Sequence, residues 1–340
     1  MKKNILVTGG LGFIGSHTAV CLHEAGFEPI LVDNLCNSQM SALNGIESLI
    51  GYLPTFIHAD VTEKTILSNI IREYNPHAII HFAAFKAVGE SVEKPLMYYH
   101  NNVVGLVSVL EAMKENNLNN LVFSSSCTVY GEPDSVPVSE NTPTKPAQSP
   151  YGATKQMGEI ILKDNQNWCN TQCLRYFNPI GAHHTAAIGE LPLGVPNNLI
   201  PYLTQTVAGI RPELTVFGND YDTPDGTCIR DYIHVMDLAD AHVKAVERLL
   251  NKQQATNFEV FNIGTGNGFS VLEVIESFEK VNHIKVPHKI GPRRAGDVVK
   301  VWADTTKVET ELGWKAKRGL DQMMKDAWNW QIKLNQINHS

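Results

Sequence analysis

The chain has 340 residues, 43% hydrophobic and 19% charged, and is long enough to bury a large apolar core. Its 35 acidic residues outnumber its 28 lysines and arginines, which gives a formal net charge of -7. A mildly acidic chain disfavours a dedicated nucleic-acid binder, which needs basic stripes. It also disfavours attachment to anionic membranes, and no segment approaches the roughly 20 apolar residues of a membrane-spanning helix.

The six cysteines are scattered, and none forms the CxxC pairs of a zinc site. In a chain with a large core, such cysteines indicate reduced thiols, so we expect a cytoplasmic protein. The neighbouring histidines His183 and His184 lack the spacing of a zinc hydrolase motif. We therefore expect no metal site.

Short β-rich runs alternate with helical patterns through the first half of the chain. We expect buried strands at residues 5–8, 29–33, 56–60, 78–83, 121–125 and 172–177. A helix is expected over 16–25, with Gly26 closing it. This alternation predicts right-handed βαβ units and an α/β fold, with a doubly wound, Rossmann-like parallel sheet.

The second half differs, because Pro- and Gly-rich stretches interrupt it at 131–150, 178–201 and 218–230. Long loops of this kind are usually functional or disordered. Helices are expected over 237–250 and 271–281, with a strand at 259–263 between them. We predict one domain over 1–178 and a smaller C-terminal α/β domain over 179–340. A segment around 231–264 could return to the first domain.

A glycine-rich turn joins the first expected strand to the first helix. Gly9, Gly12 and Gly15 have the spacing GxxGxxG, which permits a tight turn and close approach to a pyrophosphate at the helix N-terminus. Asp33 closes the second expected strand, near the ~20-residue offset at which an acid meets the adenosine ribose. A carboxylate accepts bonds from a 2′-hydroxyl and repels a 2′-phosphate. These residues therefore predict an NAD site.

A tyrosine–lysine pair carries the second chemical signal. Ser149 and Pro150 are typical of a helix start, which makes Tyr151 and Lys155 i,i+4 neighbours on one face. A phenol with a pKa near ~10 is a poor base at neutral pH. A nearby ammonium and a cationic nicotinamide would lower that pKa. The serines at 124–126 end an expected strand, in the crevice where doubly wound sheets bind ligands.

The glycine turn, Asp33, the serines and the Tyr–Lys pair together resemble the extended short-chain dehydrogenases/reductases. Longer blocks resemble the UDP-glucose 4-epimerase family within that group, and they cover nearly the whole chain. The blocks include DNLCNS (33–38), FKAVGESVEKP (85–95), FSSSCTVYG (123–131), RYFNPIGAH (175–183), PNNLIPY (196–202), FGNDY (217–221) and RDYIHVMDLAD (230–240).

The resemblance implies NAD-dependent epimerisation at C4 of UDP-hexoses, by transient hydride transfer through a 4-keto intermediate. Tyr151 would remove the proton of the 4-hydroxyl, Ser126 would bond the same oxygen, and Lys155 would bond the nicotinamide ribose. The first domain would bind NAD and the second the UDP-sugar. A homodimer is also implied.

The resemblance assigns the remaining binding residues by matching positions. NAD contacts are expected from Gly9, Gly12, Phe13, Ile14, Gly15, Asp33, Asn37, Ser38, Asp60, Val61, Phe82, Ala83, Lys86, Asn101, Ser124, Tyr151, Lys155 and Tyr176. UDP-sugar contacts are expected from Lys86, Ser126, Tyr151, Asn178, Asn198, Leu199, Phe217, Arg230, Tyr232, Arg294, Asp297 and Val301. The two arginines also suit a pyrophosphate on chemical grounds alone.

Two departures from the family pattern bear on the substrate. Val301 stands where family members restricted to unacetylated sugars have Tyr, so we hypothesise that UDP-GlcNAc and UDP-GalNAc are also accepted. Cys127 stands where the family usually has Ala.

A nucleotide-sugar 4,6-dehydratase is one alternative, but it needs an Asp–Glu pair where this chain has Cys127 and Thr128. A non-catalytic NAD-sensing protein is another, although it would be expected to lose Tyr151 or Lys155.

Overall fold

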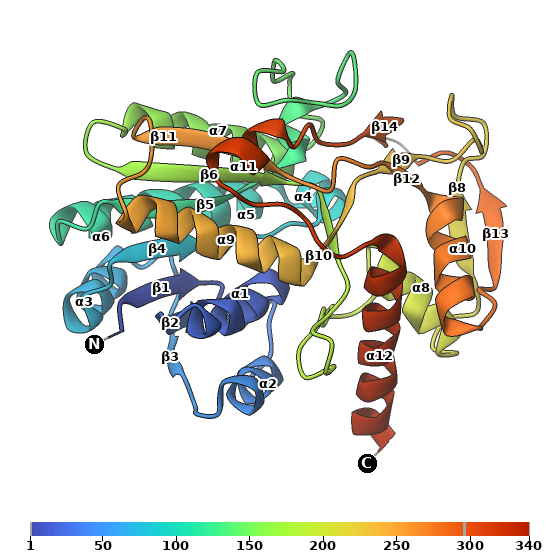
Figure 1. Ribbon diagram of the computed structural model, residues 1–340, viewed down its shortest axis with the longest axis horizontal. Coiled ribbons are helices and arrows are strands. Elements are labelled where there is room, and N and C mark those ends of the chain that lie inside the picture. Colours follow the sequence, from blue (N-terminus) through green and yellow to red (C-terminus); the bar gives the residue numbers. More distant parts are fainter. Residues whose placement is uncertain (1, 295–296, 340) are drawn as a thin grey trace.

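The centre of the fold is a parallel β-sheet, as the computed structural model of residues 2–294 and 297–339 shows (Figure 1). Within these described residues the sheet has seven strands in the order β11-β6-β5-β4-β1-β2-β3, and every neighbouring pair is parallel. The strands are β1 (Asn4–Thr8), β2 (Glu28–Asp33), β3 (Thr55–His58), β4 (Ala78–His81), β5 (Asn120–Ser126), β6 (Asn170–Tyr176) and β11 (Phe258–Ile263). Strand order reverses beside β1, as in a doubly wound sheet, so the predicted fold class is confirmed.

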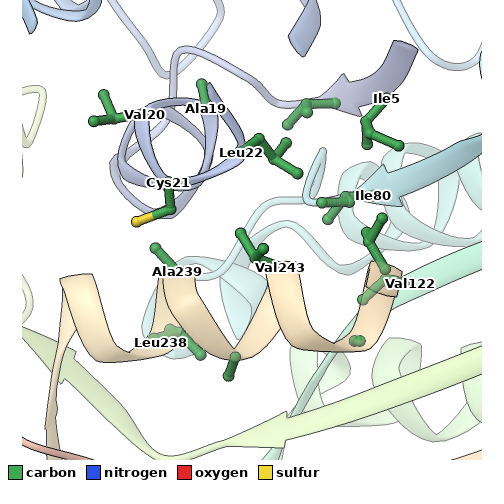
Figure 2. Packing of buried hydrophobic residues seen from close by; sticks show 14 of the residues in the cluster. Ile5, Ala19, Val20, Cys21, Leu22, Ile80, Val122, Leu238, Ala239 and Val243 are labelled. Atoms are coloured by element: carbon green, nitrogen blue, oxygen red, sulfur yellow. The ribbon is translucent and has the colours of Figure 1, made fainter. Parts of the chain in front are cut away.

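Helices cover both faces of this sheet, which explains the apolar runs of its central strands β1, β2 and β4. On one face lie α1 (Phe13–Glu24), α2 (Ser41–Ile50) and α9 (Val235–Leu250). On the other lie α3 (Lys64–Tyr74), α6 (Gly105–Glu115) and α7 (Pro150–Asp164). Successive side chains of a strand enter opposite cores: Val7 joins the first and Leu6 the second. Figure 2 shows the first core, where Cys21 of α1 faces Ala239 of α9.

A smaller lobe lies to the right of the sheet in Figure 1. Its apolar core is formed by α8 (Leu199–Val207), α10 (Val271–Asn282), α12 (Leu320–His339) and β8 (Leu214–Phe217), and β8 pairs in parallel with the more exposed β13 (His288–Gly291). Short strands connect this lobe to the sheet. They are β7 (Asn178–Ile180) beside β10 (Tyr232–His234), and β9 (Ile229–Arg230) between β12 (Phe269–Ser270) and β14 (Lys300–Val301).

Several short helices flank the ends of β4, β5 and β11. They are α4 (Val88–Glu93), α5 (Pro95–Tyr98), the π-helix η1 (Tyr99–Val104), the 3-10 helix η2 (Cys127–Tyr130) and α11 (Thr306–Glu311). π-Helical turns are rare in proteins, and those that occur are often found at functional sites. No helix among the described residues is both long enough and apolar enough to cross a membrane.

All seven predicted strands are present, with ends that differ from the prediction by at most two residues. The predicted start of the first helix is wrong, because α1 begins at Phe13 rather than Ser16. Gly12 has extended dihedrals (φ -69, ψ 172) and serves as the N-cap, so the helix starts inside the glycine motif. At the other end Ala25 is the C-cap, and Gly26 follows it with φ 86.

Candidate active site

The glycine turn between β1 and α1 is shaped for close approach of a ligand. Gly9 has φ 68, and a Cβ on it would lie 2.8 Å from the backbone nitrogen of Ala83. A Cβ on Gly15 would collide with the Gly9 carbonyl. Since Gly12 has no side chain to cap α1, the N–H groups of the first turn are available to an anion. The predicted pyrophosphate contact of Gly9, Gly12 and Gly15 therefore fits this turn, as does the placement of Phe13 and Ile14 in its first helical residues.

Asp33 ends β2 and organises the loop that follows. Its Oδ2 accepts a hydrogen bond from the backbone N–H of Leu11 at 3.0 Å. Its Oδ1 accepts bonds from the Leu35 N–H at 2.9 Å and from the Ser38 hydroxyl at 2.7 Å. Asn37 is exposed in the same loop. The structure thus brings Asp33, Ser38 and the glycine turn together, while their contact with a ribose stays a prediction.

Six more of the residues predicted to contact NAD follow β3 and β4 in the chain. Asp60 accepts from the Thr62 N–H at 2.8 Å and from Asn34 Nδ2 at 2.7 Å, so its carboxylate also holds a turn. Val61 is buried beside it. Phe82, Ala83 and Lys86 lie in the loop after β4, and Asn101 lies in η1.

Asn102, which the sequence analysis missed, fastens the loop after β4 to the neighbouring helices. Its Oδ1 accepts from the Phe85 N–H at 2.9 Å. Its Nδ2 donates to the Phe85 carbonyl and to Thr154 Oγ1, both at 3.0 Å. Because Thr154 belongs to α7, one buried side chain fixes the loop, η1 and α7 relative to one another.

The Tyr–Lys pair lies on α7 as predicted from its start signals. Ser149 is the N-cap and accepts from the Gly152 N–H at 3.1 Å, and Pro150 is the first helical residue. Tyr151 and Lys155 are both buried, and Lys155 Nζ lies 5.9 Å from the centroid of the Tyr151 ring.

The end of β5 meets this helix face. Lys155 Nζ donates to the Ser124 carbonyl oxygen at 2.6 Å. The Ser124 hydroxyl is in close contact with the hydroxyl of Tyr176 at the end of β6. Ser126 ends β5 and is buried. The structure therefore gathers the predicted catalytic residues Tyr151, Lys155 and Ser126 with Ser124 and Tyr176.

Burial dominates the electrostatics of this pair. It raises the pKa of Tyr151 to about 12, which interaction with the Ser126 hydroxyl opposes. It lowers the pKa of Lys155 to about 8, which the charge of Glu159 opposes. The predicted lowering of the tyrosine pKa is thus not produced by the protein's own groups. Desolvation of the phenolate is the largest cause of the shift, and the Lys155 ammonium donates to a carbonyl instead of to the phenol.

Four residues predicted to contact the UDP-sugar form a cluster in the smaller lobe. Arg294 donates to Asp297 Oδ1 through Nη2 at 2.7 Å, and Arg230 Nη2 lies 4.0 Å from the same oxygen. The guanidinium of Arg294 lies 5.6 Å from the centroid of the Phe217 ring. Tyr232 follows in β10 and is buried. Two cations therefore share one carboxylate, which leaves positive charge for an anion.

The remaining substrate predictions occupy the elements around this cluster. Asn198 is the N-cap of α8 and Leu199 its first residue, while Asn178 begins β7. Glu190, which the sequence analysis missed, accepts from Lys86 Nζ and from Asn198 Nδ2, each at 3.0 Å. It thereby links a residue predicted to contact NAD to one predicted to contact the sugar nucleotide.

Val301 pairs in register with Arg230 between β14 and β9 and is buried. It belongs to a small apolar cluster with Val129, Tyr130 and Phe177. Since Tyr130 and Val129 lie in η2, directly after Ser126, Val301 is close in structure to the predicted catalytic serine.

Known proteins match the chain over nearly its full length. A family model described as GDP-mannose 4,6 dehydratase matches residues 6–327. A UDP-glucose 4-epimerase of Yersinia pestis is 50% identical over 333 residues, which is 97% of each chain. One of Bacillus subtilis is 50% identical over 96% of each chain. The chain belongs to the UDP-glucose 4-epimerase family of extended short-chain dehydrogenases/reductases.

Solved structures of the UDP-glucose 4-epimerase family have the same fold. The enzyme of Stenotrophomonas maltophila, with bound NAD and formylated UDP-arabinopyranose, is 44% identical with a TM-score of 0.95, and the match covers 98% of this chain and 99% of that one. The enzyme of Bifidobacterium longum, in complex with NAD+ and UDP, is 44% identical with a TM-score of 0.93, over 97% and 98%. The family resemblance expected from the sequence is therefore confirmed.

Proposed function

We propose that the protein interconverts UDP-galactose and UDP-glucose by NAD-dependent epimerisation at C4. The observation that carries this proposal is the buried Tyr151–Lys155 face of α7, set against the serines that end β5. It stands beside the glycine turn that fits a dinucleotide, in a chain of the UDP-glucose 4-epimerase family.

Tyr151 is the proposed acid–base group. Its phenolate, favoured when a cationic nicotinamide adds its charge to that of the Lys155 ammonium, takes the proton of the sugar 4-hydroxyl, and the resulting phenol returns it at the end of the cycle. Ser126 hydrogen-bonds the same sugar oxygen, and Lys155 holds positive charge beside the phenol. NAD, held by the glycine turn and Asp33, would supply a hydride acceptor and donor for C4 of the sugar, so the net reaction would consume no cofactor.

Arg230 and Arg294 are the proposed pyrophosphate anchors. Guanidinium groups match phosphate oxygens with paired, charge-assisted hydrogen bonds. Asp297 orients Arg294 through the bonds described above, and Arg230 lies close to the same carboxylate. We propose that the other residues assigned by the family resemblance contact NAD and the UDP-sugar as the sequence predicts.

A 4,6-dehydratase is a second candidate, because the matching family model carries that description. Dehydration requires an acid that protonates the departing 6-hydroxyl and a base at C5. The residues after Ser126 are Cys127 and Thr128, and burial raises the pKa of the Cys127 thiol to about 12. Neither residue supplies a carboxyl group, which favours epimerisation. Retention of Tyr151 and Lys155 likewise favours an enzyme over an NAD sensor.

We further propose that N-acetylated UDP-hexoses are substrates. Val301 is smaller than the Tyr of family members restricted to unacetylated sugars, and it lies beside the residues after Ser126. The UDP-GlcNAc/UDP-GalNAc pair should be turned over by the wild type and lost in Val301→Tyr. Failure of both proteins on that pair, with activity on UDP-galactose intact, would refute this specificity.

The proposal also covers domain division, assembly and location. We assign NAD binding to residues 1–178 and UDP-sugar binding to 179–340, with the segment around 231–264 returning to the first domain because β11 extends its sheet. Exposed apolar side chains on α5, α6 and α7, including Leu96 at 81% and Ile160 at 60% exposed, support a homodimer through these helices. All six cysteines are free, which supports a cytoplasmic location.

Product analysis without added cofactor tests the main proposal. The purified protein is incubated with UDP-galactose, and the products are identified by NMR. We expect UDP-glucose, with NAD released on denaturation. A 4-keto-6-deoxy sugar would indicate the dehydratase instead, and an unchanged substrate would overturn the proposal.

A further inference from the structure

A buried ion pair lies directly behind the Tyr–Lys face of α7. Glu159 follows Lys155 by about one helical turn, so its side chain continues the same stripe of the helix. Its carboxylate accepts from Arg175 of β6, through Nε at 2.8 Å and Nη2 at 2.6 Å. Ser125 of β5 donates a third hydrogen bond at 2.5 Å. All three partners are buried, so solvent weakens these bonds little.

The hydrogen bonds of Glu159 to Arg175 and Ser125 connect α7 to two neighbouring strands. Ser125 and Arg175 are register partners across β5 and β6. Ser125 lies between Ser124, which accepts the Lys155 hydrogen bond, and Ser126, the proposed partner of the sugar oxygen. A shift of Glu159 would therefore move α7 relative to the strand that carries both serines.

Arg175 is itself fixed by a further network. Its Nη1 donates to the Tyr130 hydroxyl at 3.0 Å, and that hydroxyl donates to Asn262 Oδ1 at 2.6 Å. The guanidinium also lies 4.9 Å from the centroid of the Tyr130 ring. Residues of β11 and η2 thus hold Arg175 of β6, which binds the carboxylate of α7 together with Ser125 of β5.

The same carboxylate faces the Lys155 ammonium. The titratable groups around Lys155 are Tyr151 and Glu159 of α7, His81 of β4, and Cys173, Arg175 and Tyr176 of β6. Burial lowers the pKa of His81 to about 3 and raises that of Cys173, so both are uncharged at neutral pH. Tyr151 is likewise protonated, since its pKa is about 12. Among these groups of the described chain, Glu159 is the only carboxylate, and it is paired with Arg175.

We propose that Glu159 is a positioning residue for the Tyr–Lys pair. Held by Arg175 and Ser125, it fixes the orientation of α7 on the sheet and keeps the Lys155 ammonium charged. This inference rests on the proposed function, because it assumes that the pair performs the proton transfer.

The chain offers a closely matched control. At the far edge of the sheet, Glu259 accepts from Arg248 through Nε at 2.8 Å and Nη2 at 2.9 Å, and from Gln172 at 2.6 Å. This is also a bidentate Arg–Glu pair, with Arg248 partly buried and a fourth bond from the Ala255 N–H at 2.8 Å, and it joins α9 to β11 rather than to α7. Glu159→Gln and Glu259→Gln should therefore cost similar stability and differ only in what they do to Lys155.

The experiment compares the two variants as NAD-bound enzymes. Lys155 is titrated by NMR of ¹³C-labelled lysine, with Lys155→Met used to assign its signal, and kcat for UDP-galactose is measured against pH. In Glu159→Gln we expect the Lys155 midpoint to fall by about one pH unit, a tenfold loss of proton affinity. The alkaline decline of kcat should move with it. Glu259→Gln should keep the wild-type midpoint and pH profile.

An unchanged midpoint in Glu159→Gln, or an equal shift in both variants, would overturn the proposal. If Glu159→Gln does not fold, Ser125→Ala removes one bond to the carboxylate and leaves both charges in place. It should lower kcat several-fold without moving the midpoint, and an unaltered kcat would contradict the positioning role. A wild type that does not convert UDP-galactose would refute the proposed function, while the lysine titration would still decide whether Glu159 controls the charge.

Discussion

Replacement of Asn102 by Ala should destabilise the loop after β4, which lies on the NAD side of the site. The side chain accepts one hydrogen bond from Asn101 and makes three more that join Phe85 and Thr154, and it is 8% exposed. At a net value of about 1 kcal/mol per hydrogen bond, the loss of these last three should lower the free energy of unfolding by about 3 kcal/mol. Water that reaches the Phe85 backbone would reduce this to about 2 kcal/mol.

The same change should weaken NAD binding, because Phe82, Ala83 and Lys86 lie in the loop that Asn102 fastens. We expect affinity to fall by about tenfold, which corresponds to 1.4 kcal/mol of binding free energy. Urea unfolding and the NAD content of the purified variant measure the two effects.

Asn116→Ala is a suitable control for the Asn102 variant. Asn116 is the C-cap of α6, where its side chain donates to Ser68 and to the Ala112 carbonyl, away from the loop after β4. It should lose some stability and retain wild-type NAD content. A loss of less than 1 kcal/mol in the Asn102 variant, or a loss of NAD equal to that of the control, would refute the reasoning.

Three further outcomes are expected. Tyr151→Phe should abolish turnover and retain NAD, since it removes the acid–base hydroxyl alone; near-normal activity would refute that role. Asp33→Ala should weaken NAD binding and relax discrimination against NADP, because it removes the carboxylate that orders the loop after β2. Binding measurements that find an unchanged preference for NAD would contradict the assignment of Asp33 to the ribose. Turnover should fall as pH rises through about 8, where Lys155 loses its proton, and a profile flat to pH 10 would disprove the need for the ammonium.

Much of the fold could be predicted because parallel strands buried on both faces are continuous apolar runs. The smaller lobe is harder to predict from the sequence, since β9, β12 and β14 have only two residues each and depend on tertiary pairing. Helix starts were predictable where a side chain marks them, as at Ser149. The start of α1 was misplaced because Gly12 caps without a side chain.

In the candidate site, too, residues marked by local sequence are predictable and residues that act through tertiary contacts are not. The Tyr–Lys spacing and the glycine turn carry their chemistry in local sequence, so both were predictable. Glu159 also has an i,i+4 signal relative to Lys155, but its partner Arg175 comes from another strand, and only folding pairs them. Asn102 and Glu190 act through bonds to distant residues, and no local pattern distinguishes them from ordinary polar side chains.

The most direct test of transient hydride transfer follows an isotope at C4. UDP-galactose that carries deuterium at C4 is converted in ordinary water, without added NAD, and the UDP-glucose formed is analysed by NMR. Return of the same hydride by NAD that stays bound predicts that the deuterium remains at C4 of the product. Its replacement by solvent hydrogen would contradict the account.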